Sequence, residues 1–152
     1  MAPRKPGQKR DKALHLVVRR IIEAPAERLF RAWTEPDQLA KWWGPPPARC
    51  PRAEVDLRVG GKYRIANAFP DGSVVWIVGV FERISPPLEL VYSWRLEGSK
   101  GVTERVTVRF EGSGNTTEVV VLHECIADAP SRGRHEKGWD GCLDGLARYV
   151  SL

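Results

Sequence analysis

The C-terminal segment 131–152 carries the clearest hydrophobic pattern in the chain. Its apolar residues recur at intervals of three and four, namely Trp139, Cys142, Leu143, Leu146 and Val150. This spacing places them on one face of an α-helix, with charged residues on the opposite face. The segment therefore predicts a long amphipathic helix. Because no earlier segment predicts a helix of similar length, we expect its apolar face to pack on a sheet.

Three glycines interrupt this predicted helix, at Gly138, Gly141 and Gly145. Each costs about 1 kcal/mol relative to alanine in a helix interior, so each needs a compensating reason. One explanation is close packing of the helix backbone against a curved sheet. The other is that the missing side chains leave space for a ligand beside the helix. The sequence leaves both open.

The segments before this helix have mostly the patterns of β-strands. Alternation is cleanest where Val106, Val108 and Phe110 interleave with polar residues, and Asp71-Gly72 is a strong hairpin signal. We expect a first strand at 14–23 and about six antiparallel strands later in the chain. Those later strands are predicted at 52–56, 63–69, 74–84, 88–96, 105–111 and 118–125.

Two short helices are expected between the first strand and the rest. Pro25 suits the first turn of one helix, and the stretch from Thr34 to Asp37 resembles a capping box that starts a second. Prolines at 45–47 end the second helix. A twisted antiparallel sheet that curls around the long helix, with two short helices beside it, favours an apolar cavity between these layers.

Composition adds limits to this architecture. Residues 1–12 contain five Lys and Arg and one Asp, whereas residues 13–152 contain 19 Lys and Arg and 18 Asp and Glu. The basic character thus belongs to a tail, which we expect to be disordered, ahead of one domain at 13–152. The tail has no interleaved aromatic residues, so no specific nucleic-acid binding is expected. A nonspecific phosphate-binding arm is the alternative.

Compartment and membrane association follow from the same composition. No apolar run is long enough to span a bilayer, so membrane insertion is not expected. The N-terminus has no signal-peptide pattern. The cysteines are three, an odd number, and scattered, which argues against a disulfide framework. The sequence therefore favours a cytoplasmic protein. It does not define the oligomeric state, for which a monomer or homodimer is expected.

Several short motifs occur in an order typical of a known family. They are Ala24-Pro25, residues 29–34, Trp42-Trp43-Gly44-Pro45, Gly60-Gly61 with Tyr63, Asp71-Gly72, and His135 with Gly138-Trp139. With them the chain resembles bacterial homologues of the C-terminal domain of the Hsp90 ATPase activator, within the START-like, Bet v 1-like superfamily. The resemblance covers about residues 13–152. It implies an α+β helix-grip fold, in which a curved antiparallel sheet of six to seven strands wraps around the C-terminal helix.

The resemblance, together with the aromatic content, leads to a binding hypothesis. We expect a hydrophobic, aromatic or polycyclic small molecule between sheet and helix, bound for sequestration, self-resistance or a stress response. The candidate ligand-binding residues are Phe30, Trp42, Trp43, Tyr63, Phe69, Trp76, Trp94, Trp139 and Leu143. The alternatives are a protein-interaction module that acts on a chaperone and a cyclase- or aromatase-like enzyme of polyketide pathways. Binding is favoured over catalysis because inward acid–base candidates are few.

The remaining polar residues give weaker signals. His123 and Cys125 are two apart on one predicted strand and are expected on the same face. Two ligands do not make a metal site, so we expect no metal and no cofactor. His135 is expected at the surface or near a cavity entrance. Polar side chains that could orient a ligand, if buried, are Arg20, Asn67 and Glu104. Cys142 is expected to be a small core residue.

Overall fold

The predicted order of helices and strands is present in the structure, a computed structural model that describes residues 13–152. The predicted basic tail lies outside the described residues. The elements in chain order are β1 (Leu14–Ile22), α1 (Ala26–Thr34), α2 (Pro36–Trp42), β2 (Ala53–Val55), β3 (Lys62–Ala68), β4 (Val74–Ser85), β5 (Glu89–Leu96), β6 (Glu104–Ser113), β7 (Thr116–Ile126) and α3 (Ala129–Val150).

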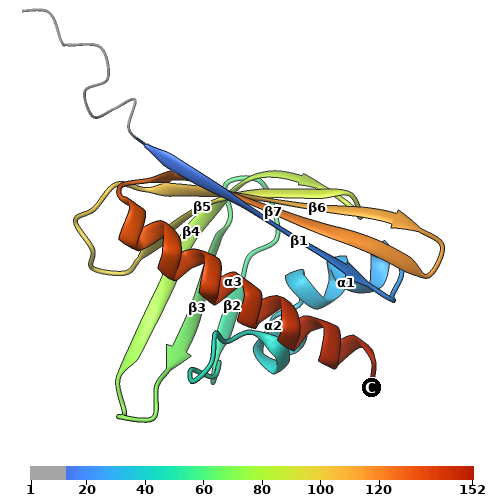
Figure 1. The fold of residues 1–152 in the computed structure, drawn as a ribbon, viewed down its shortest axis with the longest axis horizontal. Coiled ribbons are helices and arrows are strands. Elements are labelled where there is room, and N and C mark those ends of the chain that lie inside the picture. Colours follow the sequence, from blue (N-terminus) through green and yellow to red (C-terminus); the bar gives the residue numbers. More distant parts are fainter. Residues whose placement is uncertain (1–12) are drawn as a thin grey trace, which may run out of the picture.

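The strands form one seven-stranded antiparallel sheet in the order β1-β7-β6-β5-β4-β3-β2. The first strand therefore pairs with the last one, and β2 lies at the far edge. Helix α3 runs across one face of the curved sheet, and α1 and α2 lie beside it on the same side (Figure 1). This arrangement is the predicted helix-grip fold.

The core lies between β6, β7 and α3. The inward residues of β6 alternate as predicted, and Val106, Val108 and Phe110 are fully buried. Leu143 and Leu146 of α3 are fully buried as well. Each such side chain contributes roughly 1.5–3 kcal/mol by leaving water. The apolar face of α3 is thus buried against the sheet and α2, with its closest approach to the sheet at β1.

A bulge near the end of β7 changes the predicted alternation. Cys125 has a positive φ of 66°, and the pairing of β1 with β7 shifts between Leu14 and Leu16. Because the bulge inserts an extra residue, Ile126 returns to the buried face, while Cys125 is only partly buried. The expectation that His123 and Cys125 share a face was therefore wrong.

The junction between the two short helices also differs from the prediction. Thr34 ends α1, and its hydroxyl donates to the Phe30 carbonyl at 2.8 Å. Glu35 is the N-cap of α2, with Pro36 in the first turn. Thr34 is therefore not the cap, because its hydroxyl already bonds within the preceding helix. Asp128, which was not predicted, caps α3 by accepting from the Ser131 N–H.

The glycines of α3 have two different explanations. A Cβ at Gly145 would lie 2.5 Å from the Trp42 carbonyl oxygen, and one at Gly141 would lie 2.6 Å from Pro46. These two glycines allow close packing, but against α2 and the loop after it rather than against the sheet. A Cβ at Gly138 would meet nothing nearer than 3.7 Å. Gly138 therefore has room beside it.

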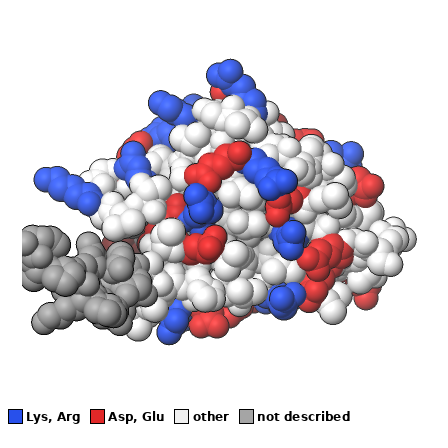
Figure 2. Space-filling model, turned by 90° about the horizontal axis from the view of Figure 1, so that it is seen from above, with Lys and Arg blue, Asp and Glu red and all other residues white. Residues whose placement is uncertain are grey.

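The surface carries mixed charge. Positive and negative side chains are interspersed on the face shown in Figure 2. Several pair within or between strands, including Arg105 with Glu82 and Arg109 with Glu89. Within residues 13–152, none of the helices has the length and apolar composition needed to cross a bilayer.

Candidate functional site

A partly open cavity of about 290 Å³ lies between the first half of α3 and strands β3 to β5. Most of its wall is apolar, and its polar groups come from few residues. The lining residues include the aromatic side chains Trp43, Phe69, Trp94 and Trp139, the aliphatic Val75, Ile77 and Leu96, and the polar Asn67, Arg134 and His135. An apolar pocket with a few converging polar groups is typical of small-molecule sites.

Trp43 is held in place at the end of α2. Its indole N–H donates to Asn67 Oδ1 of β3 at 3.0 Å, and both residues are buried. The Trp43 ring meets the Trp139 ring edge to face, with centroids 5.4 Å apart. Because the indole N–H is satisfied by the protein, the orientation of this wall does not depend on a ligand.

Trp139 is fixed in a similar way from α3. Its indole N–H donates to Nδ1 of His123 on β7 at 3.0 Å. His123 is fully buried, and a nitrogen that accepts an N–H donor carries no proton of its own. This hydrogen bond therefore makes His123 a neutral imidazole with its proton on Nε2.

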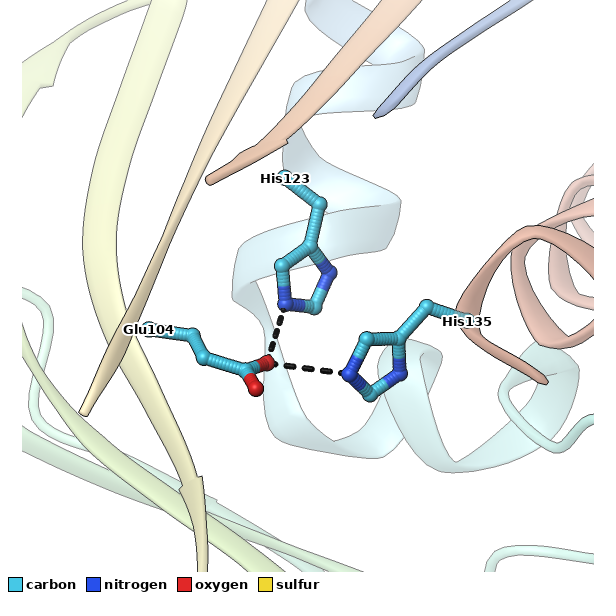
Figure 3. A group of neighbouring side chains, drawn as sticks. All are labelled: Glu104, His123 and His135. Atoms are coloured by element: carbon cyan, nitrogen blue, oxygen red, sulfur yellow. Dashed lines mark hydrogen bonds and ion pairs between the residues drawn. The ribbon is translucent and has the colours of Figure 1, made fainter. Parts of the chain in front are cut away.

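Glu104 joins the two histidines (Figure 3). His123 Nε2 lies 2.7 Å from Glu104 Oε1, and His135 Nε2 lies 2.9 Å from the same oxygen. The two imidazole rings are stacked, with centroids 4.4 Å apart and planes 14° from parallel. The Trp94 ring contacts both edge-on, with centroids 5.1 Å from His123 and 4.8 Å from His135. We call Glu104, His123 and His135 the Glu–His–His cluster.

The charge states in the cluster follow from these contacts. Burial alone would raise the pKa of Glu104, but hydrogen bonds and charge interactions with His123 and His135 lower it to about 2. Burial lowers the pKa of His123, although the nearby carboxylate opposes this. At neutral pH Glu104 is therefore an ionised acceptor, and both facing Nε2 atoms carry the protons.

The cluster has the composition of a metal site, since one ligand atom from each residue lies within 4.8 Å of the others. The hydrogen bonds of His123 oppose one. Binding a metal through His123 Nε2 would move the His123 proton to Nδ1, where the Trp139 N–H already points. The arrangement favours hydrogen bonds between these three side chains over a bound metal cation.

A second hollow of about 240 Å³ adjoins the cavity. The two share Trp94, Leu96, Arg134 and His135, and Glu104 lines only the second. His135 therefore stands between both spaces, with 18% of its side chain exposed. This agrees with its expected place near a cavity entrance.

Four of the nine predicted ligand-binding residues line the cavity: Trp43, Phe69, Trp94 and Trp139. The other five lie elsewhere. Phe30 and Leu143 are core residues, and Trp42 is buried with its N–H donated to the Ala32 carbonyl. Tyr63 lines a space of about 20 Å³ and a hollow of about 500 Å³, neither of which is this cavity. Cζ of Arg64 lies over the Trp76 ring, 3.9 Å from the ring centroid, and Trp76 does not line the cavity.

Among the polar candidates, Asn67 and Glu104 take part in the site, whereas Arg20 pairs with Asp144 on α3. Cys142 is buried at the cavity wall, and burial raises the pKa of its thiol to about 12. The Glu–His–His cluster was not predicted. The sequence showed only a histidine within an apolar strand. Without the strand register, it could not indicate which residues contact that histidine.

The fold and the cavity together define a helix-grip protein with an aromatic pocket beneath its C-terminal helix. The family model for Activator of Hsp90 ATPase homolog 1-like protein matches residues 23–151, and the chain belongs to this family. Family and fold support a ligand-binding or interaction module in general. A comparison with curated proteins gave no match.

Solved bacterial structures share the fold. Protein CV1439 from Chromobacterium violaceum is 27% identical, with a TM-score of 0.83 over 91% of this chain and 97% of that one. The AHSA1-like protein from Aeromonas hydrophila is also 27% identical, with a TM-score of 0.75 over 91% and 92%. The AHSA1 protein from Silicibacter pomeroyi, 23% identical, has a TM-score of 0.82 over 91% and 99%, a likeness of fold alone.

Proposed function

We propose that this protein binds a small hydrophobic molecule, aromatic or with a few fused rings, in the cavity beneath α3. The observation that carries the proposal is the fixed orientation of two cavity tryptophans. The N–H groups of Trp43 and Trp139 are both used inside the protein, so their rings form an apolar wall before any ligand arrives. Such preorganisation reduces the entropy lost on binding.

The size of the cavity limits the ligand. A volume of about 290 Å³ lies at the lower end of the roughly 300–1,000 Å³ typical of ligand pockets. Burial of about 200 Å² of apolar ligand surface contributes roughly 5 kcal/mol, from which the cost of association is subtracted. We therefore expect weak binding of simple probes and tighter binding of a ligand that also uses the polar groups.

The test is a two-dimensional NMR titration that follows the indole N–H signals of the tryptophans with a panel of apolar, aromatic and polycyclic compounds. We expect saturable shifts for Trp43, Trp94 and Trp139, which line the cavity, and little change for Trp42 and Trp76. If the N–H signals of these three residues did not shift with any compound of a chemically broad panel, the proposal would be contradicted.

A matched pair of variants connects the shifts to the cavity. Gly138→Leu places a side chain next to Pro45 at the cavity wall, where a Cβ has ordinary contact distance, so it should abolish binding while the protein stays folded. Gly133→Leu adds the same side chain to the same helix, where a Cβ meets none of the described residues within 4 Å. It should bind like the parent protein. Equal binding by both variants would place the ligand elsewhere.

The biological purpose of binding is a finer proposal. If the ligand is a reactive natural product, binding alone would sequester it, as in self-resistance or a stress response. An enzyme of the cyclase or aromatase kind needs an acid–base group at the cavity, and His135 beside Glu104 could supply one. Turnover of a bound compound, followed by chromatography, separates catalysis from sequestration.

The second candidate is a protein-interaction module that acts on a chaperone. It is supported by the description of the family, Activator of Hsp90 ATPase homolog 1-like protein. Stimulation of a purified Hsp90 ATPase by this protein would support it. The variant Gly138→Leu distinguishes the two candidates, because a filled cavity should leave surface-mediated stimulation unchanged and should abolish ligand binding.

A further inference from the structure

The polar end of the cavity is formed by two neighbouring residues of α3, Arg134 and His135. Among residues 13–152, no aspartate or glutamate lines this cavity. The Arg134 guanidinium donates to the Ser131 hydroxyl at 2.9 Å, and within residues 13–152 no carboxylate lies within 4.0 Å of it. Asp128, the N-cap of α3, is an acidic group close enough to interact with the Arg134 charge. Arg134 is therefore available to a ligand anion.

His135, which lines the same cavity as Arg134, has an open acceptor atom. Its Nε2 faces the ionised Glu104, which can only accept, so the proton of a neutral His135 sits on Nε2 and the lone pair on Nδ1. Nδ1 lies on the side of the ring away from Glu104 (Figure 3). Among the described residues it has no hydrogen-bond partner. By contrast, Nδ1 of the neighbouring His123 is occupied by Trp139.

We propose that the cavity recognises a weakly acidic hydroxyl, a phenol or an enol, on its aromatic ligand and binds it as the oxyanion. The inference rests on the proposed ligand-binding function. The ligand O–H bond breaks, and its proton goes to Nδ1 of His135. The resulting imidazolium lies between Glu104 and the ligand oxygen, and Arg134 pairs with the oxyanion. No oxidant or other reactant is needed.

The arrangement favours this class over other acids. A carboxylic acid is already ionised at neutral pH, so the lone pair of a neutral His135 would face a negative charge. An amine would meet the Arg134 charge. A phenol or enol uses the lone pair, the cation and the apolar wall together, because its hydroxyl is joined to a planar, conjugated body that can lie against Trp43, Trp94 or Trp139.

The experiment compares two probes of nearly the same shape, 7-hydroxycoumarin and 7-methoxycoumarin. The first has a weakly acidic phenol whose neutral and ionised forms absorb at different wavelengths, and the second has no such proton. At pH 7 we expect a larger phenolate fraction for bound than for free 7-hydroxycoumarin. 7-Methoxycoumarin should bind more weakly and shift the same tryptophan N–H signals.

Variants assign the effect to the two residues. His135→Gln and Arg134→Gln should each lower the affinity for 7-hydroxycoumarin by about tenfold, as expected for loss of a charge-assisted contact, and should remove the extra phenolate signal. The affinity for 7-methoxycoumarin should change less than about twofold. Lys137→Gln removes an exposed cation of the same helix that does not line the cavity, and it should change neither affinity.

The outcomes separate this inference from the function on which it rests. If both coumarins bind at the cavity signals but 7-hydroxycoumarin stays neutral, the hydroxyl proposal is wrong and ligand binding stands. If neither coumarin binds and no compound of the wider panel shifts the tryptophan N–H signals, both proposals fail. Because Arg134 is exposed, Arg134→Gln keeps the test decisive if His135→Gln does not fold.

Discussion

Replacement of Glu104 by glutamine gives a quantitative test of the Glu–His–His cluster. Glutamine has nearly the same shape but no charge. The pKa of Glu104 falls from an ordinary value of 4.5 to about 2 in the folded protein. At about 1.4 kcal/mol for each tenfold change in proton affinity, this lowering corresponds to roughly 3 kcal/mol of stability at neutral pH. We expect Glu104→Gln to lose up to about this amount.

The pH dependence has a definite sign. A carboxyl group whose folded pKa is lowered stabilises the protein fully above its unfolded pKa, here 4.5, and this stabilisation is lost as the pH falls through the folded value of about 2. The stabilisation that Glu104 gives the parent protein relative to Glu104→Gln should thus be retained from pH 7 down to about pH 5. It should shrink steadily below that.

The assay is urea unfolding followed by tryptophan fluorescence at a series of pH values. Glu111→Gln is the matched control, because Glu111 lies on the same strand with an exposed side chain. It should cost less than about 0.5 kcal/mol. If Glu104→Gln were no less stable at pH 7 than this control, or if its deficit persisted at pH 2, the charge assignment of the cluster would be refuted.

Two further predictions concern packing outside the cavity. Gly145→Ala should destabilise the protein by about 1–3 kcal/mol, because its Cβ would lie 2.5 Å from the Trp42 carbonyl oxygen. In the same helix, the Cβ of Gly133→Ala meets no part of residues 13–152 within 4 Å, so this variant should stabilise by up to about 1 kcal/mol. Thermal unfolding of both variants tests the contrast. Thr117→Val should cost about 1–2 kcal/mol in urea unfolding, since the buried hydroxyl donates to the Ala24 carbonyl at 2.7 Å; unchanged stability would show that water replaces this bond.

The fold could be predicted because its signals are local. The stripe of α3, the alternation of β6 and the Asp71-Gly72 turn each indicate one element without knowledge of the rest. The errors were local as well. Thr34 has the residue type of a cap, but its hydroxyl is used by the preceding helix, and the bulge at Cys125 has no clear sequence signature.

The site was harder to predict because it depends on strand register. Val106 pairs with His123, which places Glu104 diagonally across from that histidine, and no short-range pattern specifies this pairing. The tryptophans illustrate the same limit. Trp76 lies within a nearly unbroken apolar run of β4, so the sequence does not indicate its face. In the structure its neighbours Val75 and Ile77 line the cavity, and Trp76 does not.

The β3–β4 wall of the cavity and the Glu–His–His cluster come from different parts of the fold, and this separation has a consequence for specificity. The groups that can exchange protons lie on β6, β7 and α3, whereas Phe69, Val75 and Ile77 belong to the β3–β4 hairpin and its turn. Substitutions in the hairpin can change the size and shape of the accepted ligand without disturbing the Glu–His–His cluster. Selectivity for the size and shape of the ligand could therefore diverge, or be redesigned, while the proposed recognition of the ligand hydroxyl stays the same.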